Sequence, residues 1–183
     1  ERTILNFLQR LSGCATHARE IVSQSNGIIV ADTRKTTPGW RVLEKYAVRL
    51  GGVRNHRSCL GDQILIKDNH IDANGGDISK TLEKVFSYKG VYTPVEVEVR
   101  DLDEVKKVIP FGPNAIMLDN MSDSQIVESI KLIKEKSPRT LIEVSGGVRP
   151  ADLSRLASLG VEIVSMGFLS NYRTVDITLD IKL

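Results

Sequence analysis

Six short apolar segments that alternate with helical stretches constrain the fold of this chain more than any other feature. They occupy residues 27–31, 63–67, 94–99, 115–118, 140–144 and 162–166, and each is rich in Val, Ile or Leu. Short apolar runs of this kind are typical of buried parallel strands. Their spacing of roughly 20–35 residues matches a βα unit. The pattern therefore predicts an α/β fold with a parallel sheet.

The stretches between these segments carry signals for the start and the end of helices. Ser122, followed three residues later by Gln125, predicts a capping box. Pro150 suits the first turn of a helix, and Gly160 suits the end of the same helix. Residues 1–25 are predicted to be helical with an interruption near Gly13. Residues 176–183 alternate polar and apolar residues like a strand, but they lie outside the regular spacing of the βα units.

The length of the chain and the positions of its polar residues narrow the fold further. A complete eight-unit barrel needs about 250 residues, and this chain has 183. No G-x-G-x-x-G turn follows the first apolar segment, which argues against a dinucleotide-binding Rossmann fold. Polar residues instead cluster at the C-terminal end of nearly every predicted strand, where barrel enzymes place their chemistry. We therefore predict an open or incomplete, TIM-like α/β barrel with about six βα units.

The composition is that of an ordinary globular protein, with 41% hydrophobic and 26% charged residues. A formal net charge of +2 is too small to indicate a nucleic-acid partner or an anionic membrane surface. No apolar run approaches the ~18 residues of a membrane span. Cys14 and Cys59 do not make a disulfide framework, and no secretory leader is evident, so a reducing, cytoplasmic setting is expected.

One region of the chain is more basic than the rest. Between Ala31 and His70, eight Lys and Arg residues stand against four Asp and Glu residues. This local excess of positive charge indicates an anionic ligand. For Arg41, Lys45 and Arg49, which share a predicted helix, exposure on a solvated helix face is the better explanation.

Candidate ligand-binding residues in this basic region lie beside predicted strands. Arg34 and Lys35 follow a strand and precede a helix, where two cations suit a carboxylate or phosphate; a solvated loop pair is an equal alternative. His56 and Arg57 precede the next strand, and no His or Cys at metal-binding spacing accompanies His56, so a zinc site is not expected. Lys67 ends an apolar run and either extends to solvent or, as we favour, faces an anionic ligand.

The later strands add carboxylates and glycines. Glu96 and Glu98 alternate with valines and therefore project from one face, which predicts an inward pair unless the strand lies at an edge. Asp119 ends an apolar run, where a carboxylate can bind ribose hydroxyls or a divalent ion, or cap the loop. The sequence SGG at 145–147 and Gly167 allow backbone N–H groups to approach a ligand closely, as in the phosphate site of late barrel strands.

Nine segments of the chain together carry a resemblance to a known family. They are ERT (1–3), LSG (11–13), DTRKTTPG (32–39), EKY (44–46), NHR (55–57), IKDNH (66–70), EVEV (96–99), LDNM (118–121) and SGG (145–147). The chain resembles quinolinate phosphoribosyltransferase, also called carboxylating nicotinate-nucleotide pyrophosphorylase, along its whole length. The resemblance implies an open-faced α/β barrel preceded by an N-terminal α/β domain, most of which lies outside this chain. Residues 1–26 would then be a helical lead-in, 27–170 the catalytic barrel and 171–183 a closing strand.

The resemblance also implies a reaction. Members of the family join quinolinate to phosphoribosyl pyrophosphate (PRPP) with Mg²⁺, release pyrophosphate and CO₂, and form nicotinate mononucleotide for NAD synthesis. The implied partners are these two small molecules and further copies of the same chain, in a homodimer or a higher homo-oligomer. Neither a nucleic acid nor a membrane is implied.

The same resemblance assigns roles to individual residues. Quinolinate would be held by Arg34, His56, Arg57, Lys67 and, reaching across from a neighbouring subunit, Arg2. The catalytic residues would be Lys35, Lys67, Glu98 and Asp119. The phosphoribosyl group and the phosphates would meet Lys35, Glu98, Asp119, Ser145, Gly146, Gly147, Gly167 and Asn171. Glu98 and Asp119 would meet Mg²⁺ indirectly, with PRPP. Asn171 stands where many members carry a histidine, and it adds no positive charge.

Two alternatives remain open at this point. One is a related barrel phosphoribosyltransferase with another substrate, of the type associated with molybdenum transport. The other is a non-catalytic, truncated remnant that folds or assembles without activity. The retention of the basic and acidic residues named above argues against a remnant.

Overall fold

The computed structural model describes residues 1–180, and its strands and helices follow the predicted order. The strands are β1 Ile29–Ala31, β2 Ile64–Ile66, β3 Val95–Val99, β4 Ala115–Asp119, β5 Leu141–Ser145 and β6 Ile163–Ser165. The helices are α1 Arg2–Ser23, α2 Arg41–Leu50, α3 Asp68–Ala73, α4 Ile78–Tyr88, α5 Leu102–Val108, α6 Asp123–Lys136 and α7 Leu153–Ser158. Short 3-10 helices lie at η1 Ile109–Phe111, η2 Pro150–Asp152 and η3 Gly167–Ser170. Each observed strand begins and ends within two residues of a predicted one.

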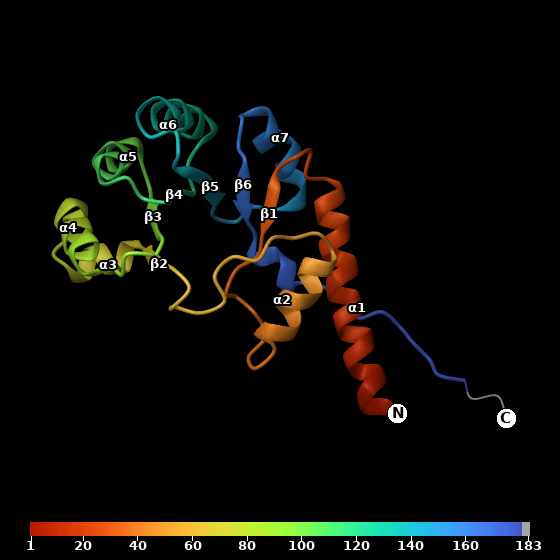
Figure 1. The fold of residues 1–183 in the computed structure, drawn as a ribbon. Helices are drawn as coiled ribbons and strands as arrows, with labels where there is room; N and C mark the ends of the chain where they lie inside the picture. The colour runs from red at the N-terminus through yellow and green to blue at the C-terminus, as the bar shows by residue number, and fades with distance from the viewer. Residues whose placement is uncertain (181–183) are drawn as a thin grey trace.

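The strands form one parallel sheet in the order β1-β6-β5-β4-β3-β2. This is the order of strands around a barrel that is opened between β1 and β2. The segment that joins α2 to β2 runs across the gap between these two edge strands (Figure 1). Among the described residues, its only bridge to β1 pairs Ala31 with Arg54. The prediction of an open α/β barrel is confirmed.

Helices α4 to α7 cover the outer face of the curved sheet, while α1 and α2 pack together beside β1 (Figure 1). In β3, the valines at 95, 97 and 99 are fully buried and belong to the core between sheet and helices. Glu96 and Glu98 alternate with them and therefore face the inside of the barrel. Since β3 is flanked by β2 and β4, the edge-strand explanation for this acidic pair is wrong.

The predicted interruption of the first helix is wrong, because α1 runs through Gly13 without a break. The glycine serves a close contact instead of a kink. A Cβ atom at this position would overlap the backbone carbonyl of Arg173, which lies against the helix. Gly13 therefore allows the C-terminal segment to approach α1.

The predicted closing strand at 171–183 is also wrong for residues 171–180, which contain no strand; residues 181–183 lie outside the described part of the chain. The Val175 N–H donates to the Gln9 carbonyl at 3.1 Å, and the Gln9 side chain donates to Ile177 O at 3.0 Å. These contacts draw the segment along α1 and away from the sheet, where its alternating side chains have no strand partner.

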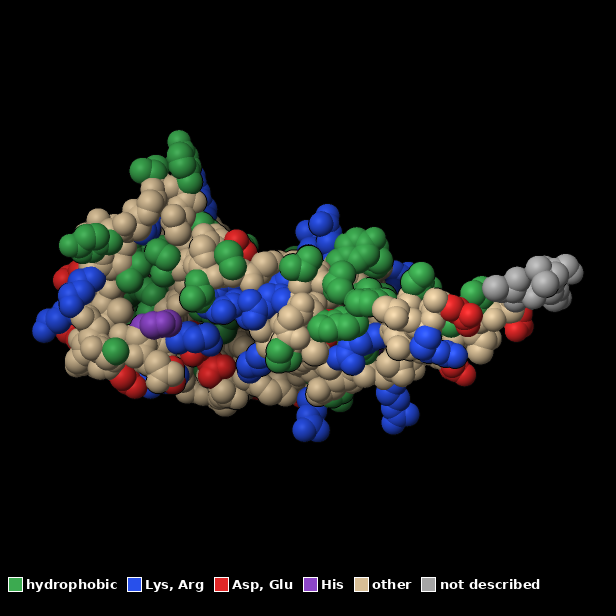
Figure 2. All heavy atoms as spheres, turned by 90° about the horizontal axis from the view of Figure 1, so that it is seen from below, with side chains coloured by type: hydrophobic (Ala, Val, Ile, Leu, Met, Phe, Trp, Pro, Cys, Tyr) green, Lys and Arg blue, Asp and Glu red, His purple; other side chains and the backbone are tan. Residues whose placement is uncertain are grey.

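A group of large apolar side chains lies at the surface near the start of α1 and on α2 (Figure 2). Its members are Ile4, Phe7, Leu8, Val42, Leu43, Tyr46 and Leu50. Across the two helices, Phe7 stacks on Trp40 with ring centroids 4.9 Å apart. Among residues 1–180, none of the helices has the length and apolar character needed to cross a bilayer.

Candidate active site

Two adjoining cavities open at the C-terminal edge of the sheet. The first, here called the cationic cavity, has a volume of about 360 Å³ and is lined by Asp32, Thr33, Arg34, Lys35, His56, Arg57, Leu65, Lys67, Met117, Ser145 and Ser165. The second, here called the polar cavity, has a volume of about 590 Å³, and its lining includes Lys35, Lys67, Glu98, Asp119, Ser145, Gly146, Gly147, Gly167 and Asn171. Lys35, Lys67 and Ser145 line both cavities, so the two form one continuous site.

The cationic cavity holds two guanidinium groups, those of Arg34 and Arg57. Burial lowers the pKa of Arg57, and the nearby charge of Arg34 lowers it further. The Nε atom of Arg34 is buried and has no hydrogen-bond partner among the described residues. Two partly desolvated like charges that repel each other are stabilised by an anion placed between them.

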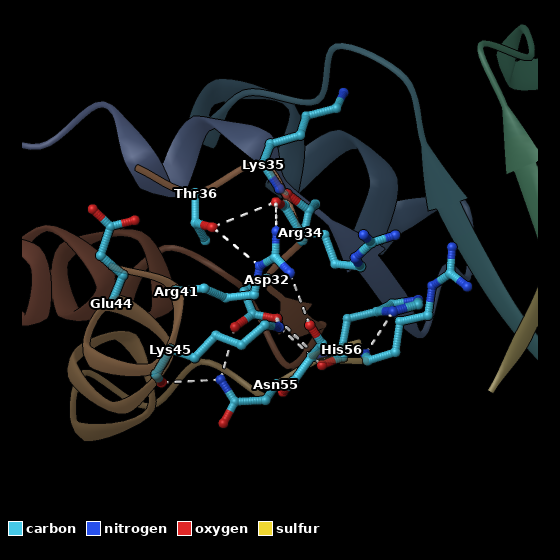
Figure 3. Close-up of polar contacts among 12 residues, drawn as sticks. Asp32, Arg34, Lys35, Thr36, Arg41, Glu44, Lys45, Asn55 and His56 are labelled. Carbon is cyan, nitrogen blue, oxygen red and sulfur yellow. Dashed lines mark hydrogen bonds and ion pairs between the residues drawn. The ribbon is translucent and has the colours of Figure 1, made fainter. Parts of the chain in front are cut away.

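Asp32, at the end of β1, anchors the segment that carries His56 and Arg57 (Figure 3). Its carboxylate accepts from Lys45 Nζ at 2.5 Å, from Asn55 Nδ2 at 2.7 Å and from the His56 backbone N–H at 2.7 Å. Both partners of the Lys45–Asp32 ion pair are almost fully buried. The buried carboxylate therefore fixes an otherwise irregular segment across the open side of the barrel.

The interpretation of the α2 cations as a solvated face is wrong for Lys45 and incomplete for Arg41. Lys45 faces inward, toward Asp32, and also donates to His56 O at 2.9 Å. Arg41 donates to Thr36 Oγ1 at 3.3 Å and to Arg34 O at 3.4 Å, so it supports the loop after β1 (Figure 3). Arg49 is exposed, as predicted.

A buried acidic pair lies below the cationic cavity. Glu96 of β3 and Glu143 of β5 place carboxylate oxygens 3.0 and 3.7 Å from His56 Nε2. Burial raises the pKa of Glu143 to about 7, and the charge of Glu96 adds to the rise. Burial acts to lower the pKa of His56, but the hydrogen bond and charge of Glu96, with the charge of Glu143, raise it above its ordinary value. Sequence reasoning missed Glu143, although it interrupts an apolar strand in the same way as Glu96.

The polar cavity combines an ion pair with a second strand-end carboxylate. Lys67 Nζ pairs with Glu98 across the ends of β2 and β3. Asp119, at the end of β4, accepts a hydrogen bond from Asn120 Nδ2 at 2.7 Å. The structure thus brings Lys67, Glu98 and Asp119 to one cavity, which places Lys67 among the other charged site residues rather than at an isolated strand end.

Glycines shape the floor of the polar cavity after β5 and β6. Gly146 and Gly147 have φ angles of +94° and +60°, which L side chains rarely adopt. A Cβ atom on Gly146 would also overlap Asn120. At Gly167 a Cβ atom would lie 3.3 Å from the Lys35 side chain. The glycines therefore leave room that any other residue would fill, as a close approach of ligand to backbone requires.

Two further residues from the sequence analysis lie at the margins of the site. Asn171 is exposed and lines the polar cavity. Arg2 is exposed at the first position of α1 and lines neither cavity.

The helix expected near Pro150 is short: it consists of η2 followed by the six-residue α7. The glycine backbone itself, and not a long helix, therefore faces the cavity.

Comparison with known proteins identifies the family. Residues 14–181 match the family model described as quinolinate phosphoribosyl transferase, C-terminal domain. The chain belongs to this family. It is 39% identical over 189 residues to the probable carboxylating nicotinate-nucleotide pyrophosphorylase of Methanothermobacter thermautotrophicus. This match covers 100% of this chain and 67% of that protein. The protein of the same name from Bacillus subtilis is 41% identical over 187 residues, covering 100% and 63%.

A solved structure agrees with these sequence relatives. The crystal structure of nicotinate-nucleotide pyrophosphorylase from Ehrlichia chaffeensis has a TM-score of 0.89 and 36% identity, and the match covers 100% of this chain and 66% of that one. The chain therefore spans about two thirds of the length of these relatives. The family and the barrel fold expected from the nine sequence segments are confirmed.

Proposed function

We propose that this chain carries the catalytic site for phosphoribosyl transfer from PRPP to quinolinate, with decarboxylation to nicotinate mononucleotide. The observation that carries the proposal is the junction of the two cavities. A cavity with two guanidinium groups opens directly into a larger one that holds strand-end carboxylates and a glycine-lined floor. The first suits an aromatic dicarboxylate, and the second suits a sugar with phosphate groups. The names of the relatives support the same reaction.

In this proposal the cationic cavity binds quinolinate. A dianion needs positive charge on more than one side, and Arg34 and Arg57 supply two guanidinium groups that can each bind a carboxylate in a bidentate way. Lys67, at the border of the two cavities, adds a third charge beside the reacting ring. His56 borders the cavity, but both of its ring nitrogens contact protein groups.

The polar cavity would bind the phosphoribosyl part of PRPP. Glu98 and Asp119 lie where carboxylates can stabilise positive charge as it develops on the ribose. Lys35 and Lys67 would neutralise the departing pyrophosphate, while the backbone of Ser145, Gly146 and Gly147 and the loop at Gly167 would receive the 5′-phosphate. Asn171 would add a hydrogen bond at this end of the cavity.

The donor set of the polar cavity fits Mg²⁺. Glu98 and Asp119 offer carboxylate oxygens, and the same lining contains Asn69 and Asn120. Hard oxygen donors of this type suit Mg²⁺, which usually reaches a protein together with substrate phosphates. When bound, the ion would supply charge neutralisation for the pyrophosphate leaving group.

Decarboxylation then follows from the chemistry of the product. Once the ring nitrogen carries the ribosyl group, its positive charge stabilises the electron pair that stays at C2 when CO₂ departs, and a proton from solvent then binds C2 in place of the carboxylate. The residues of the site need only hold the ring in place during this step, and no side-chain nucleophile is required. The positive groups of the cationic cavity therefore serve binding and orientation.

The active form would contain at least two copies of the chain, with Arg2 of one copy completing the site of another. Arg2 lines neither cavity of its own chain. Arg2 is the first residue of α1, and the exposed apolar side chains Ile4, Phe7 and Leu8 follow it within the next two turns of this helix. Sedimentation of the wild type and of Arg2→Ala, together with their quinolinate KM values, tests this arrangement.

The reaction is tested by incubating the protein with quinolinate and PRPP and measuring nicotinate mononucleotide, pyrophosphate and CO₂. We expect all three products in equal amounts with Mg²⁺ and none after chelation with EDTA. Nicotinate, which lacks one of the two carboxylates, should be a poor substrate. Efficient use of nicotinate without CO₂ release would favour a related phosphoribosyltransferase, and no product from any pyridine carboxylate would favour a non-catalytic protein.

A further inference from the structure

A closed circuit of hydrogen bonds below the cationic cavity joins Glu96 to Arg57 by two routes. On one route, Glu96 Oε2 lies 3.0 Å from His56 Nε2, and His56 Nδ1 accepts the Arg57 backbone N–H at 2.8 Å. On the other route, Gln63 Nε2 donates to Glu96 Oε2 at 2.5 Å, and Gln63 O accepts from Arg57 Nη1 at 3.2 Å.

We propose that Glu96 is a positioning residue, which acts through His56 and Gln63 to hold Arg57 in the orientation that receives the anion of the cationic cavity. The identity of that anion, quinolinate, rests on the proposed function. Glu96 lines neither the cationic nor the polar cavity, so it would shape recognition without touching the substrate.

The need for such a residue follows from where Arg57 lies. It belongs to the segment between α2 and β2, which crosses the open side of the barrel and contains neither helix nor strand from residue 55 to residue 63. A backbone of this kind has no regular hydrogen-bond ladder to hold it in place. Glu96, in contrast, is 2% exposed and lies on a strand with neighbours on both sides. The circuit thus ties an irregular segment to an interior strand of the sheet.

The geometry also fixes which nitrogen of the His56 ring carries the proton. When the ring is neutral it has one N–H and one lone pair. Because Nδ1 accepts the Arg57 N–H, the lone pair must be on Nδ1, and the remaining proton is on Nε2, where it points to Glu96. Along this route each group therefore donates a hydrogen bond to the next: the Arg57 N–H donates to His56 Nδ1, and the His56 Nε2–H donates to the Glu96 carboxylate.

A metal site is the competing explanation, because His56, Glu96 and Glu143 place potential ligand atoms within 4.8 Å of one another. Coordination at Nε2 requires a lone pair on that nitrogen, and the ring proton would then have to move to Nδ1. There it would meet the Arg57 N–H at 2.8 Å, donor against donor. The observed contact therefore favours the positioning circuit over a metal.

The main test compares steady-state kinetics of the full chain with those of Glu96→Ala, at a pH above the raised pKa of His56, where the ring is neutral. We expect the quinolinate KM to rise about tenfold, while kcat and the PRPP KM change less than twofold. Glu96→Gln, whose amide oxygen can still accept from His56 and Gln63, should restore part of the affinity. A rise of both KM values together, or a loss confined to kcat, would overturn the proposal.

Glu143→Gln is the matched control. Glu143 is also buried and acidic, and lies 3.7 Å from the same ring nitrogen, but it takes no part in the circuit. We expect its quinolinate KM to stay within twofold of the wild type. If it weakens quinolinate as much as Glu96→Ala does, the effect belongs to buried charge in general and the circuit is wrong.

A spectroscopic test is independent of activity and of variant folding. The chain has three histidines, so the ring ¹⁵N signals of His56 can be assigned in the wild type. At a pH where the ring is neutral, we expect the proton on Nε2 and a lone pair on Nδ1, with or without added Zn²⁺ or Mn²⁺. A proton on Nδ1, or a metal-induced shift of Nε2, overturns the circuit. If the ring has the expected form but the wild type makes no nicotinate mononucleotide, the proposed function fails while the circuit stands.

Discussion

The two cavities of the site are built in opposite ways, although they share one edge of the sheet. In the cationic cavity the functional atoms are side-chain charges, and buried carboxylates such as Asp32 and Glu96 hold the segments that carry them. In the polar cavity the lining includes two consecutive glycines, Gly146 and Gly147, which leave their backbone uncovered, and the acids line the cavity directly.

This difference indicates two kinds of recognition. Charge fixed by a buried network suits a rigid aromatic dianion, whose two carboxylates must be placed in one orientation. Backbone N–H groups and strand-end carboxylates suit a flexible ligand that loses a leaving group during the reaction. Substitutions should therefore separate the two substrates: changes in the cationic cavity should affect quinolinate, and changes in the polar cavity should affect PRPP or turnover.

The largest effect is expected for Asp119→Asn. In the proposed reaction Asp119 lies beside the ribose, and electrostatic groups at such positions are worth about 100-fold in rate. We expect kcat to fall about 100-fold while the quinolinate Kd, measured by calorimetry, stays nearly constant. Unchanged turnover at saturating substrates would remove Asp119 from the catalytic residues and break the separation of the two cavities.

The mirror experiment is Arg57→Ala in the cationic cavity. A charge-assisted contact contributes about 1.5–3 kcal/mol, so we expect quinolinate to bind about 10- to 100-fold more weakly. The PRPP affinity should change little, because Arg57 does not line the polar cavity. Titration of each substrate separately measures both values. Equal weakening of both substrates would contradict the assignment of Arg57 to a pyridine carboxylate.

A smaller effect, on PRPP rather than on quinolinate, is expected for Gly146→Ala. Alanine at a φ of +94° is strained by about 1–3 kcal/mol, and its Cβ would overlap Asn120. We expect the PRPP KM to rise about fivefold with little change for quinolinate. Gly112→Ala, at the end of η1, is the control: Gly112 also has a positive φ, of +59°, and a Cβ there meets nothing within 4 Å, but it lines neither cavity. If both variants bind PRPP equally well, the backbone at Gly146 does not shape the phosphate site.

Much of this site could be predicted from the sequence because strand ends are visible in it. Arg34, Lys67, Glu98 and Asp119 each follow or interrupt an apolar run, and parallel strands bring such positions to one edge. The same logic applied to Glu143, which lies between Ile142 and Val144, would have placed it inside the barrel.

The remaining features depend on contacts between distant segments. Lys45 lies on a charged helix, and only the packing of α2 against the end of β1 turns it toward Asp32. The path of residues 171–180 is set by α1, and no local pattern shows that Gln9 would bind Val175 and Ile177. The same holds for Gly13. It allows the backbone of Arg173 to approach α1 closely, and local helix propensity does not indicate such a contact.

The smallest expected effect concerns the buried carboxylate that supports the loop of Arg34. Glu44 of α2 accepts from the Thr37 backbone N–H at 3.0 Å and from Tyr172 Oη at 2.8 Å. Burial alone would raise the pKa of Glu44, but these hydrogen bonds and the nearby charge of Arg10 outweigh it and hold the pKa below its ordinary value of 4.5.

The sign of the pH effect follows from this direction. A carboxyl whose pKa is lowered by folding stabilises the folded state above its unfolded pKa, and that contribution is lost as the pH falls through the folded value. Glu44→Gln should therefore lower the free energy of unfolding at pH 7 by about 1 kcal/mol, or roughly 2–4 °C in Tm. Below pH 4 its stability should fall less steeply with pH than that of the wild type. Thermal unfolding at a series of pH values measures stability against pH for the wild type and for Glu44→Gln. Parallel curves would show that Glu44 is equally ionised in the folded and unfolded states. The loop of Arg34 would then not depend on the charge of Glu44.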